Sequence, residues 1–193
     1  MLRPDRRDVH DSLPRAFDLS RVSYFLDFAL VPVAAFALHL FALWRGVGAV
    51  GLVAATLAGL LAWSLAEYWI HRIVFHGPTA FEPMHQMHHA LPKDMIGLAS
   101  WATFAGFVGV WLAALVVAGP AFGSAFTAGV MLGYLFYCTI HVSMHHLGAR
   151  GFGRYGAMMM RLHAGHHRGG QKSKVVNFGV SSPLWDIVFR TFR

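Results

Sequence analysis

The chain has 193 residues, of which 56% are hydrophobic and only 13% charged. With a mean hydropathy of +0.49, this composition excludes an ordinary soluble domain and predicts a membrane protein. The formal net charge of +7 comes without a stripe of basic and aromatic residues, so no nucleic-acid partner is expected. Cys138 is the only cysteine, which excludes an internal disulfide and a cysteine-based zinc module.

Residues 1–23 form a charged arm with five arginines and four aspartates. A cleavable signal would have a short basic start, a short apolar core and a small-residue cleavage site. Because the arm has none of these features, we expect it to precede a retained membrane anchor. No internal repeat beyond a recurring H-x-x-H-H pattern and no linker interrupts the sequence, so residues 1–193 are predicted to form a single domain.

Four apolar runs reach the roughly 20 residues with which a helix crosses a bilayer. They cover residues 24–44, 47–70, 98–118 and 120–140. Only Arg45-Gly46 lies between the first two, and Gly119-Pro120 joins the last two. The predicted fold is therefore an all-α, polytopic membrane protein with four transmembrane helices in two tight hairpins.

The basic residues indicate how these helices are oriented. Of 16 Lys and Arg residues, only Arg45 lies in an outer turn; the other 15 lie in residues 1–23, 71–97 and 141–193. An excess of Lys and Arg marks the cytoplasmic side of a membrane protein. We therefore expect a cytoplasmic N-terminal arm and a cytoplasmic helical cap made of residues 71–97 and 141–193, in a bacterial inner membrane or an equivalent membrane.

Eleven of the 13 histidines form four short clusters, each just after an apolar run or in the predicted cap. The clusters are His71-(x4)-His76, His85-(x2)-His88-His89, His141-(x3)-His145-His146 and His163-(x2)-His166-His167. Neutral imidazole is the commonest protein ligand for transition metals, and one ion usually takes three to five such groups. The clusters therefore predict a di-metal site on the cytoplasmic side.

Helical spacing predicts how these rings are arranged. Positions i, i+3 and i+4 share a helix face, so each H-x-x-H-H triplet is expected to aim three rings at one point. His141 and His145 share a face, whereas His146 points about 100° away and is the weakest candidate. His71 and His76 do not share a face of a straight helix. Either the second span unwinds near Gly77-Pro78 or these two residues serve different ions.

Other interpretations of the histidines are less well supported. A haem would need facing histidines inside the spans, where only His39 lies, and His39 is expected to be hydrogen-bonded within the bundle. A pH sensor would not need fixed triplets. A metal transporter would need more polar residues in the spans than Asp27, His39 and Glu67. A structural metal-binding membrane protein without turnover stays an alternative, and it would close every coordination position.

Two carboxylates are candidates to orient the ligands. Glu67 lies four residues before His71, on the same helix face, and could accept the second ring N–H of a ligand histidine. Asp186 is a weaker candidate for the same task, and an interfacial carboxylate without such a role is the alternative. Imidazole-only sites suit Zn, Fe, Cu and Ni, but many histidines on two ions beside apolar spans favour oxidation of a lipid with iron and oxygen.

The motifs resemble those of the fatty acid hydroxylase/sterol desaturase superfamily of membrane di-iron enzymes, nearest to the fatty acid 2-hydroxylase branch. The resemblance covers roughly residues 60–193. It rests on Glu67-Tyr-Trp-Ile-His71-Arg72 through His76, on the three later histidine motifs with Pro92 and Asp94, and on the tail from Asn177-Phe178-Gly179 through Trp185-Asp186 to Thr191.

The resemblance implies an O2-dependent hydroxylase of a lipid acyl chain drawn from the bilayer. It implies two iron ions, which zinc can replace in a purified sample, and a separate electron donor that is cytochrome b5-like, a ferredoxin or a reductase. Hydroxylases or desaturases of carotenoid rings and of sterols share the framework and stay as alternatives. The implied metal ligands are His71, His76, His85, His88, His89, His141, His145, His163, His166 and His167. An apolar slot for the substrate is expected between the spans, lined by residues such as Trp63, Trp101, Phe104 and Tyr137.

Overall fold

The computed structural model describes residues 17–148, 152–169 and 175–193. Within these ranges the protein is helical, apart from one isolated β-bridge between Asp18 and Ile96. Most of the predicted N-terminal arm and two short stretches of the predicted cap lie outside the described residues. The elements are α2 (Arg21–Phe25), α3 (Asp27–Trp44), α4 (Ala49–Trp69), the π-helix η2 (Ile70–Phe75), α5 (Glu82–Ala90), α6 (Ser100–Val142), the π-helix η3 (Ser143–Leu147), α7 (Gly153–Gly169) and α8 (Leu184–Val188).

The first two long helices form a hairpin. A tight turn joins α3 to α4, and Gly46 adopts a φ of +88° there, which favours glycine. Inside the hairpin, His39 Nε2 on α3 lies 2.8 Å from Thr56 Oγ1 on α4. The expectation that His39 is hydrogen-bonded within the bundle is confirmed, and this contact satisfies a polar ring in an apolar environment.

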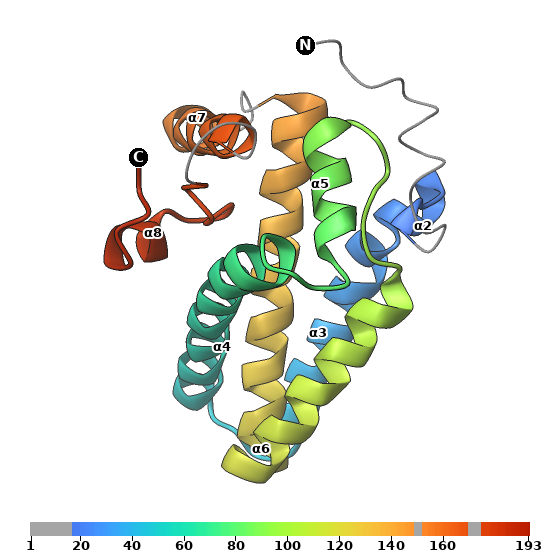
Figure 1. Ribbon diagram of the computed structural model, residues 1–193. Helices are drawn as coiled ribbons and strands as arrows, with labels where there is room; N and C mark the ends of the chain where they lie inside the picture. The colour runs from blue at the N-terminus through green and yellow to red at the C-terminus, as the bar shows by residue number, and fades with distance from the viewer. Residues whose placement is uncertain (1–16, 149–151, 170–174) are drawn as a thin grey trace.

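Helix α6 consists of two helical arms that meet at a sharp bend. Gly119 has φ 73° and ψ 171°, which breaks the helical path, and Pro120 follows it. Figure 1 shows the two arms of α6 lying side by side. Across the bend, Trp111 Nε1 donates to Ser124 Oγ at 3.0 Å. The bend lies where the sequence predicts a turn, and Gly119 interrupts the helical conformation there.

Among the described residues, three helical segments are long and apolar enough to cross a membrane, namely Arg21–Trp44, Ala49–Phe75 and Ser100–Leu147. There are three rather than four because the last segment includes both arms of α6, which correspond to the two last apolar runs. Large apolar side chains on these helices face outward, among them Val33, Phe36, Val53, Leu57 and Val116. The protein is an integral membrane protein, since lipid tails rather than water suit such a surface.

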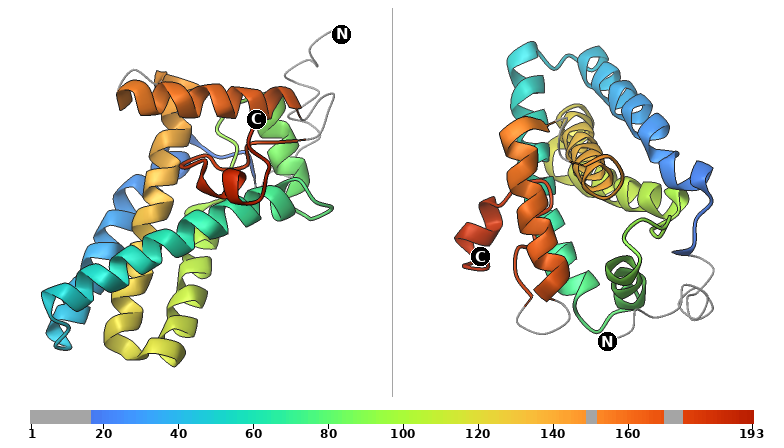
Figure 2. Two further views of the ribbon diagram at one scale, coloured as in Figure 1. Left: turned by 90° about the vertical axis from the view of Figure 1, so that its left-hand side faces the viewer. Right: turned by 90° about the horizontal axis from the view of Figure 1, so that it is seen from above.

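The core of the bundle forms where α6 packs between α3 and α4, as Figure 2 shows from the end of the bundle. Val31, Phe107 and Met131 are buried at its centre. Glycines allow the closest approach: a Cβ at Gly59 would overlap the carbonyl oxygen of Phe126, and one at Gly129 would overlap that of Thr56. Small residues at a helix crossing are typical of membrane bundles, where packing drives association.

Three short helices cover one end of this bundle. In the left view of Figure 2, α7 lies across the ends of the long helices, with α5 beneath one end of it. Helix α8 packs against α4, where Trp185 Nε1 donates to Ser64 Oγ at 3.0 Å and the Phe189 ring stacks on Tyr68. The histidine motifs lie between the bundle and these covering helices.

Candidate metal centre

The wide turn of η2 brings His71 and His76 together. A π-helix has i→i+5 hydrogen bonds, so residues five apart lie on the same face. The structure places both rings in one cluster, with centroids 5.3 Å apart. The departure from ordinary helical spacing therefore begins at Ile70, earlier in the chain than Gly77-Pro78, and the helix ends at Phe75. Because both rings lie in one cluster, the arrangement favours a shared ion over the alternative that the two residues serve different ions.

The two H-x-x-H-H triplets each divide between two clusters. On α5, His85 and His89 point into the first cluster, while His88 points into the second. On α7 the order is reversed, because His166 belongs to the first cluster and His163 to the second. The expectation that each triplet aims at one point is wrong. The reason is the angle between neighbouring side chains. The first and last histidines of a triplet, at positions i and i+4, differ by only about 40° around the helix, whereas the middle one, at i+3, lies about 100° from the last.

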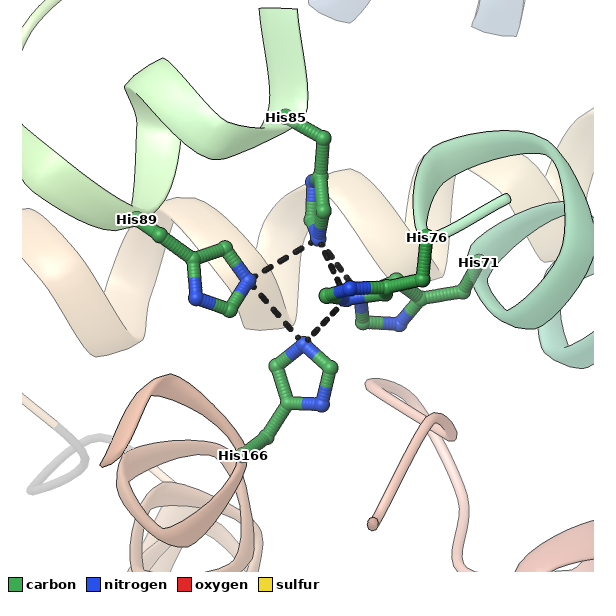
Figure 3. A group of neighbouring side chains, drawn as sticks. All are labelled: His71, His76, His85, His89 and His166. Carbon is green, nitrogen blue, oxygen red and sulfur yellow. Dashed lines mark hydrogen bonds between the residues drawn. The ribbon is translucent and has the colours of Figure 1, made fainter. Parts of the chain in front are cut away.

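The first cluster contains five histidines whose ligating nitrogens all lie within 4.8 Å of one another. Figure 3 shows their rings converging from η2 and the residue after it, from α5 and from α7. The Nε2 atom of His85 is 3.0 Å from the Nε2 atoms of His71, His76 and His89. His166 Nε2 closes the ring of contacts, 3.0 Å from His76 Nε2 and 3.1 Å from His89 Nε2.

The second cluster consists of His88, His141, His145 and His163, again with ligating nitrogens within 4.8 Å. His141 Nε2 is 3.1 Å from both His88 Nε2 and His145 Nε2. His167 lies at the border of the clusters: its Nε2 is 3.0 Å from His163 Nε2, and its ring stacks on that of His89 with centroids 4.2 Å apart. Together these ten histidines are the ones that the sequence singled out.

His146 lies outside both clusters. Its ring packs edge-on against Tyr24, with centroids 6.3 Å apart. Its Nε2 is buried and has no hydrogen-bond partner among the described residues. This position agrees with the predicted face, which points away from His141 and His145.

Backbone carbonyls fix the orientation of two rings in the first cluster. His71 Nδ1 lies 2.5 Å from the Phe178 carbonyl oxygen, and His166 Nδ1 lies 2.9 Å from that of Val176. A carbonyl only accepts, so each Nδ1 carries the hydrogen and each Nε2 presents a lone pair to the cluster. These lone pairs meet other Nε2 atoms about 3 Å away, which is unfavourable unless a cation lies between them.

The donor set fits metal ions. A neutral imidazole has one N–H, so His85 Nε2 can donate to at most one of its three Nε2 neighbours. Imidazole bonds of about 2.0–2.1 Å to a zinc ion place neighbouring ligand nitrogens roughly 3 Å apart. Other first-row transition ions require a similar separation between ligand nitrogens. The Nε2 separations of 3.0 and 3.1 Å in the first cluster match this spacing.

Burial keeps these rings neutral. It lowers the pKa of His76 and His167 to about 4, that of His166 to about 3 and that of His89 to about 2. Burial, reinforced by the neighbouring histidines, holds the pKa of three further rings on α5 and α7 well below the ordinary value; these are His85, His88 and His163. Metal binding requires unprotonated imidazole, so the rings are ready to bind metal at neutral pH.

Glu67 and Asp186 act on the backbone rather than on the rings. Glu67 accepts hydrogen bonds from the Val180 and Ser181 N–H groups at 2.7 Å each. Asp186 accepts from the N–H groups of Phe178 and Gly179, at 2.8 and 2.7 Å. Residues 176–181, called the carbonyl loop below, carry the two carbonyls that orient His71 and His166. The expected direct contact of these carboxylates with a histidine ring is therefore wrong.

The carbonyl loop is a part of the site that the sequence did not predict. Backbone carbonyls have no side-chain signature, so no residue type marks them. Two signals were available: the tail motif Asn177-Phe178-Gly179 lies in this segment, and a buried carboxylate must find donors. Glu67 and Asp186 are both buried, and each finds backbone N–H donors in the loop.

A cavity of about 150 Å³ adjoins both clusters, since His85, His88 and His141 line it together with apolar side chains such as Phe75 and Met84. A separate apolar groove of about 470 Å³ runs between α3 and α6 and is lined by residues including Leu38, Phe104 and Met131.

The residues expected to line a substrate slot are distributed differently. Tyr137 lines the cavity and Phe104 lines the groove, so these two residues border separate pockets rather than one slot. Trp101 is 78% exposed on the outer surface. Trp63 packs edge-on against Tyr134 inside the bundle, with centroids 5.3 Å apart. Trp101 and Trp63 were expected in the slot because they are aromatic residues of the spans. Sequence alone does not distinguish such residues from those that line a slot.

Comparison with known proteins identifies several relatives of this chain. The chain is 32% identical over 149 residues to the dihydroceramide fatty acyl 2-hydroxylase FAH1 of Arabidopsis thaliana, covering 72% of this chain and 61% of the relative. It is 35% identical over 144 residues to human fatty acid 2-hydroxylase, covering 69% and 38%. A ceramide very long chain fatty acid hydroxylase, scs7 of Schizosaccharomyces pombe, is 33% identical over 145 residues, covering 69% and 40%. The chain thus matches about three fifths or less of the length of these relatives.

The fold also has a counterpart among solved structures. Full-length scs7p, of which only the hydroxylase domain is visible, superposes with a TM-score of 0.70 at 22% identity, covering 89% of this chain and 67% of that one. This likeness concerns the fold. Residues 56–191, which include all ten clustered histidines and the carbonyl loop, match the family model described as fatty acid hydroxylase. The chain belongs to the fatty acid hydroxylase family.

Proposed function

We propose that the protein is a membrane hydroxylase that places a hydroxyl group on C2 of a fatty acyl chain, on a free fatty acid or on a sphingolipid acyl group. One observation carries the proposal: two facing histidine clusters adjoin a cavity that is otherwise mostly apolar. Relatives at 32–35% identity are named fatty acid and dihydroceramide fatty acyl 2-hydroxylases, which supports the choice of substrate.

The ten clustered histidines would hold two iron ions. His71, His76, His85, His89 and His166 form one set of ligands, and His88, His141, His145, His163 and His167 form the other. Iron, when bound, supplies the O2-dependent oxidation of an unactivated C–H bond; overall, O2, two electrons and two protons convert C–H to C–OH and release one water. Purified protein can carry zinc in the same positions, because imidazole sites do not select iron by affinity.

The chain's own residues prepare the ligands and exclude water. The carbonyl loop holds the His71 and His166 rings with Nε2 directed inward. Burial keeps the rings neutral, as their lowered pKa values indicate. The apolar lining of the cavity keeps bulk water from the reacting carbon. The groove between α3 and α6 would receive the distal part of the acyl chain, since it is apolar and faces the bilayer.

We further propose that the bundle crosses the membrane four times. The bend at Gly119 divides α6 into two arms of about 20 residues, and that length is enough to cross the hydrocarbon core. Basic residues of the described chain gather at the end that holds the histidines, among them Arg72, Lys93, Arg154 and Arg161, whereas Arg45 lies at the opposite end. This asymmetry supports a cytoplasmic metal site, in a bacterial inner membrane or an equivalent one. A separate electron donor, cytochrome b5-like, a ferredoxin or a reductase, would then reach the site from the cytoplasm.

The proposal is tested by lipid mass spectrometry of cells that express the full chain or lack it. We expect a gain of one oxygen atom on fatty acids or sphingolipid acyl chains. His85→Ala and His166→Ala are expected to abolish the product, because each removes a central ligand of the first cluster. His146→Ala, the matched control, is expected to keep most of it, because His146 lies outside both clusters.

The other outcomes identify the alternatives. The same gain of oxygen on carotenoids or sterols would identify the protein as a different hydroxylase on the same framework. Unchanged lipids, with both clusters filled by metal, would identify a structural metal-binding membrane protein. Equal loss of product from all three histidine variants would contradict the assignment of the ligands.

A further inference from the structure

Asp27, the first residue of α3, is a buried carboxylate with one unpaired oxygen. Its side chain is only 6% exposed. Tyr134 on α6 donates its hydroxyl hydrogen to Asp27 Oδ2 at 2.5 Å. Asp27 Oδ1 is buried and has no hydrogen-bond partner among the described residues. Buried polar atoms in native proteins are nearly always paired, so an unpaired carboxylate oxygen requires an explanation.

Asp27 lines the cavity that adjoins the metal centre. The same cavity is bordered by His85 from the first cluster and by His88 and His141 from the second. Tyr134 lines it as well. A molecule in this cavity would therefore touch the ligand histidines on one side and the Asp27–Tyr134 pair on another.

Local structure does not account for the free oxygen. The charge of Asp27 at the start of α3 suits the helix dipole. However, the N–H groups of Ala29 and Leu30, in the first turn of α3, already bond to the Leu26 carbonyl oxygen. The bond from Tyr134 joins α3 to α6 but uses only Oδ2. Neither role uses Oδ1, so this oxygen is left without a partner among the described residues and is available to a molecule in the cavity.

The chemistry of a carboxylate selects the kind of partner. It accepts hydrogen bonds, and in a site of low polarity it repels another anion. Among acyl lipids, those with an amide N–H or a hydroxyl next to the acyl carbonyl can donate to it. A free fatty acid anion has no hydrogen to donate and carries the same charge, and a simple ester offers only acceptors.

We propose that Asp27 Oδ1 accepts a hydrogen bond from the amide N–H or hydroxyl of an amide-linked acyl lipid, and that Asp27 thereby makes the protein prefer such lipids over free fatty acids. This inference rests on the proposed function for the identity of the substrate as an acyl lipid. The amide nitrogen is two bonds from C2, so a headgroup held at Asp27 keeps C2 close to it, at the side of the cavity that the histidines border. Asp27 is then a positioning residue.

The preference would come from a part of the chain outside the family match. That match covers residues 56–191, whereas Asp27 lies in the first long helix. Its effect would thus be a property of how α3 packs against α6 in this protein, and the ligand histidines would take no part in the choice.

The test is equilibrium binding to the detergent-solubilised, metal-loaded full chain. Two probes carry the same short acyl chain: an N-acyl amino diol with a free amide N–H and hydroxyls, and the free fatty acid. A third probe is the amino diol with its N–H and hydroxyls methylated. We expect the native protein to bind the amino diol about tenfold or more tightly than either other probe, in keeping with a hydrogen bond to a charged group.

Three variants distinguish a specific role of Asp27 from a general change in the shape of the cavity. In Asp27→Asn, the side-chain oxygen can still accept from Tyr134, which leaves an NH2 donor facing the cavity. We expect this variant to lose the preference for the amino diol while it keeps its metal content. Tyr134→Phe retains the carboxylate and is expected to retain the preference. Phe28→Leu, at an apolar neighbour that lines the same cavity, should weaken binding of all probes equally.

An unchanged ratio of affinities in Asp27→Asn overturns the proposal, and so does a methylated probe that binds the native protein as tightly as its parent. Loss of the preference in Tyr134→Phe, with the carboxylate intact, also overturns it. Should the native protein hydroxylate no acyl lipid yet bind the probes with the Asp27-dependent ratio, the proposed function fails while this inference stands. The opposite result is also possible. If the protein hydroxylates an acyl lipid but its ratio of affinities for the amino diol and the free fatty acid is the same in Asp27→Asn, the inference fails while the proposed function stands.

Discussion

At the level of single residues, the site depends on groups that do not face the clusters themselves but hold the candidate metal ligands in position. The carbonyls of Phe178 and Val176 hold the Nδ1–H groups of His71 and His166. Glu67 in turn holds the loop that carries these carbonyls, through the N–H groups of Val180 and Ser181. A ring that is fixed before the ion arrives loses less freedom when it binds, so such outer contacts raise metal affinity.

The role of Glu67 can be measured as metal affinity. In Glu67→Gln the amide oxygen can still accept from the Val180 and Ser181 N–H groups, but these bonds lose their charged acceptor, so the carbonyl loop loosens and the His71 ring is less well oriented. We expect metal affinity to fall by about 10–100-fold. Metal retained per chain after dialysis against graded chelator measures this change. Glu82→Gln, in the first turn of α5, is the matched control and should retain metal like the native chain; equal retention by the two variants would contradict the assigned role.

At the level of elements, the turns were predictable and the register of the ligands was not. Gly46 and Gly119 have positive φ angles, and both lie where the sequence predicts a chain reversal. Glycine marks such positions because other residues are strained there. The expected all-helical character is confirmed as well, because long apolar runs without breaks have no other stable form in a membrane.

The distribution of the ligands between clusters required knowledge of helix positions. The widened turn of η2 has no residue signature, yet it decides that His71 and His76 lie in one cluster. Likewise, His88 and His166 join the cluster opposite to that of their neighbours because α5 and α7 lie on different sides of the centre. The sequence could thus identify which histidines gather, but the cluster that each histidine joins depends on tertiary packing.

The closest helix contact in the bundle can be tested through its glycines. A Cβ at Gly59 would overlap the Phe126 carbonyl oxygen of α6, whereas a Cβ at Gly106 has no heavy atom within 4 Å. Gly59→Ala should therefore force α4 and α6 apart and cost about 1–3 kcal/mol of stability. Gly106→Ala should be neutral or stabilising by up to about 1 kcal/mol, since alanine favours helix. Thermal unfolding midpoints in detergent compare the two variants, and an equal shift in both would contradict the close crossing.

At the level of the whole molecule, the two histidine clusters join segments that are distant in sequence. The first cluster takes its histidines from η2 and the residue after it, from α5 and from α7, and the second takes them from α5, α6, η3 and α7. An ion that binds only the folded chain adds its binding free energy to the stability of the fold. The same convergence buries many imidazoles, so the stability of the metal-free fold depends on keeping those rings unprotonated.

The stability of the metal-free chain should therefore fall on acidification. The ordinary histidine pKa is about 6.5, whereas burial lowers the pKa of His76 and His167 to about 4. Between these values the unfolded chain binds protons that the folded chain does not, so the thermal midpoint should be nearly constant above pH 6.5 and decrease as pH falls toward 4. A double variant, His76→Asn with His167→Asn, should show a shallower decrease, whereas His146→Ala should follow the native curve. The measurement is a series of unfolding scans of chelator-treated protein; a midpoint that rises on acidification, or a double variant with the native slope, would show that these buried rings do not control the response.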